Sequence, residues 1–442
     1  MKDKKYKKKR SNYRWFVAFI FFLAYVAASA DRANLGIAMP FIREEFHITN
    51  TQAGGLISAF VLFYAIFQLP SAWLLQKFGV RKVIPIALFS TSLVTLGIGL
   101  SNSLLQLQLT RVMLGLAESP LPIGVTSTIN QWFPSQEKGI ATSIFIAAAK
   151  FGPVIVPPVC IAIVAIWGWR EIFIFFAIPG ILLSIVWFMG IPNYPHNTRF
   201  VNQQEIDYIE EKISHTVQKG NKILLIEPIP VLDKIIRTHN TALLSSTKEI
   251  LRSWNIIGCG ICFGFQVGIT YVLMAWLPTY FLVVKNFSLI DMGVVSSAPW
   301  IGAIVGNILG GILSDKLLKG RRKPGMMLSA LTTCLMMMLI IFIPGNALYY
   351  GFVFFLTGTL LNIGYSNYLA YPMNVANKDR FPFACAIVSM IGQLGGTAAP
   401  FITGVILDHW GWDMIFIFLG TISILTFFIL FTMAEPLNVT KL

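Results

Sequence analysis

The residues WGWREIFIF (167–175) return later in the chain as WGWDMIFIF (410–418). In both places a Trp-Gly-Trp segment precedes an apolar run long enough to cross a bilayer as a helix. A second pair, AWLLQKFGVRK (72–82) and GILSDKLLKGRRK (311–323), recurs at nearly the same separation. Aromatic and basic residues collect at membrane interfaces in any case, but two matches at nearly one offset favour an internal duplication. The sequence therefore predicts two related halves.

Apolar runs of helical length continue outward from these repeats along the whole chain. Hydrophobic residues make up 55% of the 442 and charged residues only 12%, against roughly 25% charged in soluble proteins. Runs of about 18 or more apolar residues are long enough to span the hydrocarbon core. Twelve such runs lie at 15–42, 51–77, 83–101, 103–131, 139–164, 168–190, 255–284, 288–318, 325–343, 346–376, 381–407 and 411–433. The predicted fold class is an all-α membrane protein with twelve transmembrane helices in two pseudo-symmetric six-helix bundles.

The polar segments between these runs divide the chain. In order, we expect a basic cytoplasmic tail (1–14), an N-terminal six-helix bundle (15–190), a cytoplasmic linker (191–254), a C-terminal six-helix bundle (255–434) and a short cytoplasmic tail (435–442). The linker segment NQQEIDYIEEKI (202–213) places Ile206, Ile209 and Ile213 on one helical face. We interpret it as an amphipathic helix lying against the membrane or the bundle.

Charge placement predicts the orientation. If the N-terminus is inside, most of the 34 Lys and Arg fall on the cytoplasmic side, and only Arg43, Arg170 and Lys285 lie outside. This positive-inside bias places both termini in the cytoplasm. The net charge of +14 is then an orientation signal, and because the basic residues are spread over several loops we expect no nucleic-acid partner.

One alternative would remove the first span. Ala28-Ser29-Ala30 has the A-x-A form of a signal-peptidase site and follows a basic tail and an apolar stretch. The apolar pattern continues past this site to Ile42, however, and cleavage would leave eleven spans in a chain that otherwise halves evenly. We therefore expect the first span to be retained.

Taken as a whole, the chain resembles the major facilitator superfamily. The loop between the second and third spans of each half matches the family's Gly-x-x-x-Asp-Arg/Lys-x-Gly-x-Arg/Lys pattern in part. The C-half copy keeps Gly311, Asp315 and Lys316, whereas the N-half copy has Ala72 for the glycine and Gln76 for the aspartate. In the family this loop helps to latch the halves together, so the missing carboxylate weakens that expectation for the N-half.

Four further motifs are similar to those of one branch, the anion:cation symporters, which include hexonate, hexuronate, glucarate and phthalate carriers and the vesicular glutamate and sialic acid transporters. They are DRAN (31–34), RVMLGLAESPLP (111–122), QWFP (131–134) and WLPTY (276–280). The resemblance implies a carrier of small organic anions and not an enzyme.

Five ionisable residues lie within predicted spans, all in the N-terminal half: Asp31, Arg32, Arg111, Glu118 and Lys150. Each would cost several kcal/mol facing lipid, so all must face the bundle interior, a water-filled cavity or one another. Arg111 and Glu118 are seven residues apart and share one helix face. From the rise per residue, Glu118 and Lys150 both lie ~22 Å from the outer end of their helices.

The resemblance implies a role for four of these charges. Asp31 and Glu118 would take up and release the coupling proton, Arg32 would face the substrate, and Arg111 would exchange ion pairs with the carboxylates. The chemistry suits these groups, because burial favours a protonated carboxyl and a nearby guanidinium opposes it. The alternative is a static ion network that only fixes helix packing.

Lys150 departs from the family, in which a neutral polar residue is more usual in this part of the fifth span. With it, the five charges sum to +1 before any proton binds. An anionic substrate would neutralise the excess, which favours a dicarboxylate or an acidic sugar. Alternatively, Lys150 pairs with Glu118 and never meets the substrate.

Neutral polar residues in apolar spans supply further candidates, since hydroxyl-rich anions need uncharged donors and acceptors. As substrate contacts we select Tyr64, Gln266, Asn362, Tyr365, Ser389 and Gln393. Each could equally serve an interhelical hydrogen bond. Cys259 and Cys262 have CxxC spacing within a span without a second pair, so we expect no metal site and no cofactor other than the coupling proton.

These observations predict a proton-coupled symporter that imports a small organic anion by alternating access. We expect it to be a monomer, multi-pass in a cell membrane, most plausibly the cytoplasmic membrane of a bacterium. One alternative is a proton-coupled exporter, but FGPVIVPP (151–158) has Val156 and Pro157 where exporters carry glycines. Another is a non-transporting membrane sensor, which would not need carboxylates beside cations. Organophosphate exchange would want an Arg in span 255–284, which has none.

Overall fold

The computed structural model describes residues 10–210, 233, 236–239, 243–377 and 380–436. Twelve helices of this part of the chain are long and apolar enough to cross a membrane, which confirms the predicted fold class. Those of the first half are α1 (Tyr13–Phe46), α2 (Asn50–Phe78), α3 (Val80–Gly99), α4 (Leu104–Glu118) continued by α5 (Pro120–Trp132), α6 (Lys138–Trp167) and α7 (Trp169–Gly190). Those of the second half are α11 (Trp254–Thr279) with a π-helical turn at Tyr280–Val284, α12 (Leu289–Ile312) with a π-helical turn at Leu313–Leu317, α13 (Lys323–Ile341), α14 (Ala347–Ile363) continued by α15 (Tyr365–Val375), α16 (Phe381–His409) and α17 (Trp412–Thr432).

The repeated Trp-Gly-Trp segments form the same turn in both halves. Gly168 separates α6 from α7 with φ +105, and Gly411 precedes α17 with φ +84. Both values lie in the left-handed region that glycine adopts readily and other residues rarely do. The duplication read from the sequence is therefore also a repeat of backbone conformation.

The fourth and tenth spans are each broken in the middle. Between α4 and α5 the break falls at Ser119, just before Pro120, whose ring nitrogen lacks an N–H for the helical ladder. Between α14 and α15 it falls at Gly364. The first break places Glu118 as the last residue of α4, at the centre of the first bundle.

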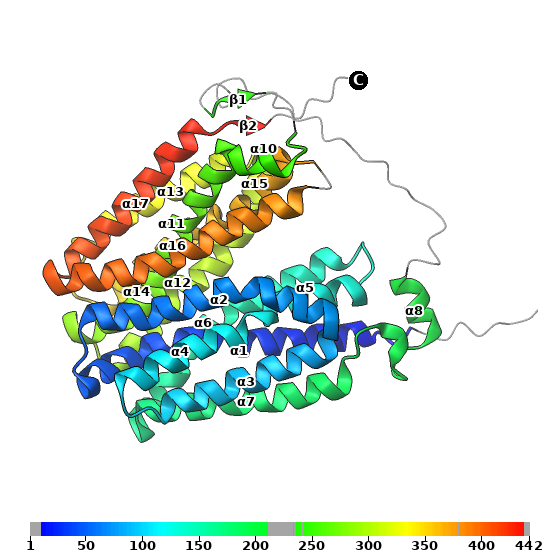
Figure 1. Ribbon diagram of the computed structural model, residues 1–442. Helices are drawn as coiled ribbons and strands as arrows, with labels where there is room; N and C mark the ends of the chain where they lie inside the picture. The colour runs from blue at the N-terminus through cyan, green and yellow to red at the C-terminus, as the bar shows by residue number, and fades with distance from the viewer. Residues whose placement is uncertain (1–9, 211–232, 234–235, 240–242, 378–379, 437–442) are drawn as a thin grey trace, which may run out of the picture.

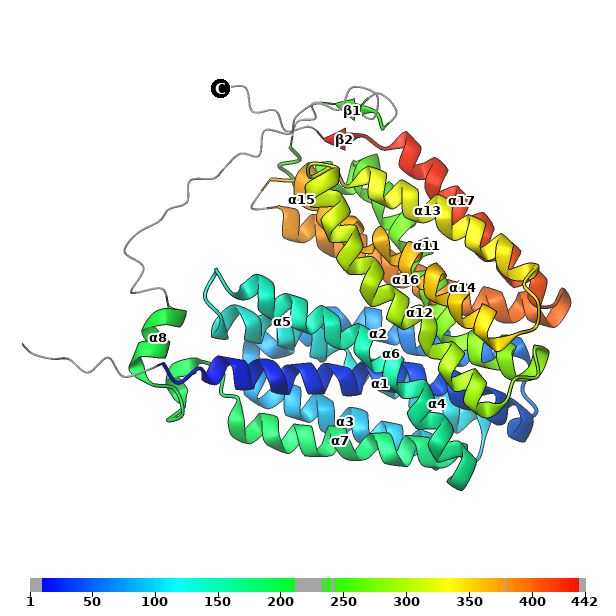
Figure 2. The ribbon, with the colours of Figure 1, turned by 180° about the vertical axis from the view of Figure 1, so that it is seen from behind.

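The two halves form separate bundles whose ribbons diverge toward the end that carries α8 (Gln203–Ile209), β1 (Thr238–His239) and β2 (Glu435–Pro436) (Figure 1 and, from behind, Figure 2). At the opposite end one hydrophobic core runs through both halves, from Ile37 and Phe60 to Trp276 and Phe416. At the diverging end each half has a core of its own. The halves are thus sealed together at one end only.

The described part of the linker is divided between the halves. Glu205 of α8 accepts hydrogen bonds from the backbone N–H groups of Tyr13 (3.0 Å) and Arg14 (3.2 Å), at the start of α1. Ile209 is buried there, so the predicted amphipathic helix lies against the bundle, while Ile213 lies outside the described residues. Short helices Pro195–Asn197 and α10 (Thr247–Arg252) complete the linker elements.

The second half has a matching arrangement. The buried carboxylate of Glu435 accepts from the backbone N–H groups of Arg322 (3.0 Å) and Lys323 (2.8 Å), at the start of α13. Glu435 is also the first residue of β2, which pairs in parallel with β1 of the linker. Burial raises the pKa of Glu435, and the two N–H donors oppose that rise. Residues 1–9 and 437–442 of the predicted tails, and 211–232 of the linker, lie outside the described residues.

Candidate functional site

The five charges predicted to lie within the membrane come from three helices of the first half. Asp31 and Arg32 lie in the middle of α1, Arg111 and Glu118 on α4, and Lys150 on α6. Asp31, Arg111, Glu118 and Lys150 are buried, and the side chain of Arg32 is 14% exposed. The structure therefore turns all five away from lipid.

Arg32 and Glu118 form an ion pair between α1 and α4. The Arg32 Nε donates to Glu118 Oε1 at 2.6 Å, and its Nη2 lies close to the same oxygen. The rings of Tyr64 and Tyr25 flank the guanidinium at 5.2 and 5.6 Å. The other carboxylate oxygen of Glu118 is buried without a hydrogen-bond partner among the described residues. Glu118 is thus held by one partner only.

Asp31 and Arg111 lie near this pair without forming a second one. Asp31 accepts from the amide of Asn34 at 3.4 Å. Arg111 donates from Nε to the carbonyl of Leu56 at 3.4 Å and lies 4.9 Å from the ring centroid of Phe60. Its Nη1 is buried without a partner among the described residues. Among the residues that the structure describes, Arg111 therefore pairs with no carboxylate in this conformation.

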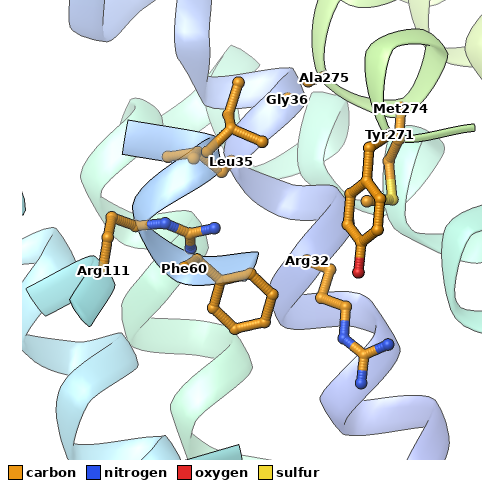
Figure 3. A pocket seen from close by; sticks show the side chains of 9 residues that line it. Arg32, Leu35, Gly36, Phe60, Arg111, Tyr271, Met274 and Ala275 are labelled. Carbon is orange, nitrogen blue, oxygen red and sulfur yellow. The ribbon is translucent and has the colours of Figure 1, made fainter. Parts of the chain in front are cut away.

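A small cavity lies between the halves beside these cations (Figure 3). Its lining comprises Arg32, Leu35, Gly36, Ile57, Phe60 and Arg111 from the first half and Tyr271, Met274 and Ala275 from α11 of the second. The hydroxyl of Tyr271 is directed toward Arg32 (Figure 3). A group entering this space would meet a guanidinium from one half and a phenol from the other.

Lys150 reaches across to the second half. Its Nζ donates to Oδ1 of Asn362 on α14 at 3.2 Å and lies 4.5 Å from the ring centroid of Tyr365 and 6.0 Å from that of Trp300. The amide of Asn362 donates in turn to the carbonyl of Gly358 at 2.9 Å, which fixes its oxygen toward the lysine. Within the described chain no hydrogen bond or ion pair joins Lys150 to Glu118. In this conformation the amine is held by Asn362 and not by Glu118, and contact of Lys150 with the substrate stays a prediction.

Three of the six predicted neutral substrate contacts lie beside a cation of the site, and the other three form no hydrogen bond with one among the described residues. Tyr64 lies beside Arg32, and Asn362 and Tyr365 lie beside Lys150. Gln266 is buried and donates to the carbonyl of Leu361, so its amide joins α11 to α14. Ser389 and Gln393 are half-buried on α16.

Four aromatic residues at the site were not selected from the sequence: Tyr25, Phe60, Tyr271 and Trp300. A Phe, Tyr or Trp inside an apolar span is common at helix interfaces, so residue type gave no sufficient signal. The CxxC thiols are structural, because Cys259 donates to the carbonyl of Tyr368 and Cys262 to that of Thr426.

Comparison with known proteins decides the family. A model of the Major Facilitator Superfamily matches residues 21–384 of the chain. The protein belongs to the Major Facilitator Superfamily. It is therefore a membrane carrier and not an enzyme, as the motifs indicated.

Curated relatives in this superfamily indicate what kind of molecule such carriers transport. The chain is 31% identical over 320 residues to a probable galactarate/D-glucarate transporter of Bacillus subtilis, covering 71% of this chain and 67% of that protein. It is 28% identical over 420 residues to a probable galactarate/D-glucarate transporter of Escherichia coli, covering 91% and 89%. A probable L-galactonate transporter of Escherichia coli is 30% identical over 309 residues, covering 69% and 62%. These similarities support a transporter of small organic anions.

Solved structures of other superfamily members share the fold. A bacterial homologue of the human lysosomal transporter Spinster, in an inward-facing and occupied conformation, superposes with a TM-score of 0.75 at 16% identity, covering 95% of this chain and 96% of that one. A D-xylose-proton symporter gives 0.73 at 16% identity, covering 97% and 100%. At this identity the likeness concerns the major facilitator fold alone.

Proposed function

We propose that this protein is a proton-coupled symporter that imports a small organic anion, a sugar acid or a related carboxylate, across a bacterial cytoplasmic membrane. The relatives carry names of sugar-acid transporters, which supports the cargo class. The excess of Lys and Arg in the loops on one side supports cytoplasmic termini. The chain would work as a monomer, since each half supplies part of the site.

The observation that carries the proposal is the buried pair of Arg32 and Glu118. While Glu118 is ionised it neutralises Arg32 and competes with any cargo carboxylate. When Glu118 takes a proton, the guanidinium loses its partner, and an anion can replace it. Proton and anion therefore favour each other's binding at one place, which is the requirement for symport.

Asp31 and Arg111 would complete the coupling. We assign Asp31 as a second proton site and Arg111 as the cation that receives a carboxylate when Arg32 turns to the cargo. The Nη1 of Arg111 and the second carboxylate oxygen of Glu118 are both buried without a hydrogen-bond partner among the described residues. Both side chains lie on one face of α4, so Arg111 is the cation left on that face when Arg32 turns away from Glu118.

The cargo would bind between the halves. The first half would supply Arg32, Tyr64 and Lys150. The second half would supply Tyr271, Asn362 and Tyr365. Gln266, Ser389 and Gln393 from the second half would add neutral donors and acceptors after a rearrangement. Because one core joins the halves at the end opposite the linker, cargo in this conformation would leave toward the linker side. Rocking of the halves about this site would expose it to the other side.

Proteoliposomes test the proposal directly. Purified protein is reconstituted, and uptake of labelled galactarate, galactonate and phthalate is followed with and without an inward proton gradient. Symport predicts uphill uptake of at least one anion that collapses when a protonophore is added. Proton-driven movement of anion in the opposite direction would support the exporter, and absence of any flux would support the sensor.

A further inference from the structure

Lys150 is a buried cation that forms no ion pair with a carboxylate in the described part of the chain. Its amine contacts an amide oxygen and two aromatic rings. A buried charge without an opposite charge is costly unless something neutralises it. The other four charges balance as a set, because two guanidiniums and two carboxylates lie on α1 and α4, although Arg111 itself forms no ion pair among the described residues.

The number of free cations at the site changes when a proton binds. In the present pairing Glu118 occupies Arg32, which leaves Lys150 and Arg111 without an ion-paired carboxylate among the described residues. Protonation of Glu118 releases Arg32 and leaves Lys150 as it was. Protonation therefore adds Arg32 of α1 to Lys150 of α6 as a cation available to the cargo.

Arg32 and Lys150 lie beside two neighbouring small cavities between the halves. Arg32 lines the cavity shown in Figure 3, and Trp300, whose ring lies near Lys150, lines a neighbouring cavity. Met274 of α11 lines both. A cargo seated along α11 would meet Arg32 at one end and Lys150 at the other.

We propose that Lys150 anchors a second anionic group of the cargo, so that the protein prefers dianionic to monoanionic carboxylates. This inference rests on the proposed function and adds its substrate class. Asn362 would hold the lysine ready while the site is empty, since its own amide is fixed by the Gly358 carbonyl. The second carboxylate would then displace Asn362 from the amine and close the contact between the halves.

Matched ligand pairs and one substitution test this assignment. Equilibrium binding to the purified full chain is measured for galactarate against galactonate, which differ at one end of the molecule, and for phthalate against benzoate. Wild-type protein should bind the dianion of at least one pair more tightly. Lys150→Gln should weaken binding of that dianion by about 10- to 100-fold, the range for a lost charged hydrogen bond, and leave the monoanion nearly unchanged. Lys285→Gln, at the outer end and outside the site, is the matched control and should change neither.

The outcomes separate the inference from the proposed function. If Lys150→Gln weakens dianion and monoanion equally, or weakens neither, the inference is wrong while the symporter proposal stands. Equal affinity of wild-type protein for both members of each pair would have the same meaning. If no carboxylate of the panel binds to wild-type protein, the proposed function is itself contradicted and the inference falls with it.

A second, independent observation concerns the sealed end. The first turn of α2 has four backbone N–H groups without helical partners. Thr49 and Gln52 satisfy two of them reciprocally: the Gln52 N–H donates to the Thr49 hydroxyl, and the Thr49 N–H donates to the Gln52 side-chain oxygen. The other two, those of Asn50 and Thr51, donate to the carboxylate of Asp408 on α16 of the opposite half, at 3.0 and 2.8 Å.

Asp408 makes this contact unusually complete. Its two oxygens also accept from the Asn50 amide at 2.7 Å and the Thr51 hydroxyl at 2.6 Å. Next to it, a Cβ on Gly404 would come within 2.4 Å of the Asn50 carbonyl oxygen, so the helices touch there through backbone. The geometry points to Asp408 as the latch of the outer end: a cap supplied by one half to a helix of the other, which must break before that end can open.

Distance measurements test the latch. Spin labels on Asn102→Cys and Gly345→Cys, exposed loop positions of the two halves at this end, report its opening in protein whose native cysteines are replaced. Asp408→Asn removes the negative charge and replaces one of the two accepting oxygens by a donating NH2 group. It should raise the ratio of open to closed molecules at this end about tenfold. The carboxylate of Asp291 accepts a hydrogen bond from Ser288 of the same half. The control variant Asp291→Asn should therefore leave the open-to-closed ratio unchanged. An identical distance distribution for wild type and Asp408→Asn would overturn the assignment.

Discussion

Replacing Glu118 by glutamine is expected to abolish accumulation of the anion against its gradient and to leave exchange of internal for external anion intact. Glutamine is neutral like the protonated carboxyl, so it would release Arg32 permanently and keep the cargo site competent. A gradient of one pH unit stores about 1.4 kcal/mol per proton, which supports about tenfold accumulation for each proton coupled. In proteoliposomes the accumulation ratio of Glu118→Gln should fall to one.

The same variant should lose its pH dependence of binding. In wild-type protein, lowering the pH protonates Glu118, frees Arg32 and strengthens anion binding. In Glu118→Gln the affinity at neutral pH should already equal the wild-type affinity at low pH. Glu44→Gln, an exposed carboxylate at the outer end of α1, is the matched control.

Asp31→Asn provides the companion measurement for the second carboxylate. If the two residues carry the protons, neutral replacement at either position stops uphill uptake while labelled anion still exchanges. Uphill, protonophore-sensitive accumulation that survives in the double variant Asp31→Asn with Glu118→Gln contradicts the coupling mechanism. In that case the buried charges only fix the packing of α1 against α4.

The second large effect is expected in the packing of the C-terminal half, for Gly358→Ala. A Cβ at Gly358 would lie 1.9 Å from the carbonyl oxygen of Pro299, and one at Gly302 2.0 Å from that of Phe355. The backbones of α12 and α14 are therefore in direct contact, with no room for a methyl group. Forced separation of such helices costs about 1–3 kcal/mol, and more when neither helix can shift. The thermal unfolding midpoint in detergent should fall clearly.

Gly351→Ala is the control on the same helix. A Cβ at Gly351 meets nothing within 4 Å, and alanine is favoured over glycine in a helix by about 0.5–1 kcal/mol. This variant should melt at or slightly above the wild-type temperature. Equal midpoints for both variants would show that the contact of α12 with α14 can relax freely. Because the Gly358 carbonyl orients Asn362, Gly358→Ala should also weaken dianion binding.

Much of the fold could be predicted from the chain alone. The length and apolarity of a run decide whether it crosses a bilayer, and both are local properties of the sequence. The described membrane helices accordingly begin and end within a few residues of the predicted runs, as with α7 (Trp169–Gly190) for the run 168–190. The cost of placing charge against lipid likewise predicted that Asp31, Arg32, Arg111, Glu118 and Lys150 would turn inward.

What the sequence could not decide is which of these groups meet. Asp31 and Arg32 are neighbours in the chain but point about 100° apart on a helix, so only the rotation of α1 against α4 selects Arg32 as the partner of Glu118. Asn362 lies 212 residues from Lys150, and its contact depends on how the two halves lean together. The same holds for Asp408 and the start of α2. Hydropathy, and the free-energy cost of exposing a charged side chain to lipid, can be evaluated for one helix at a time. Which side chains pair depends on the rotations and crossing angles between helices, and these exist only in the packed structure.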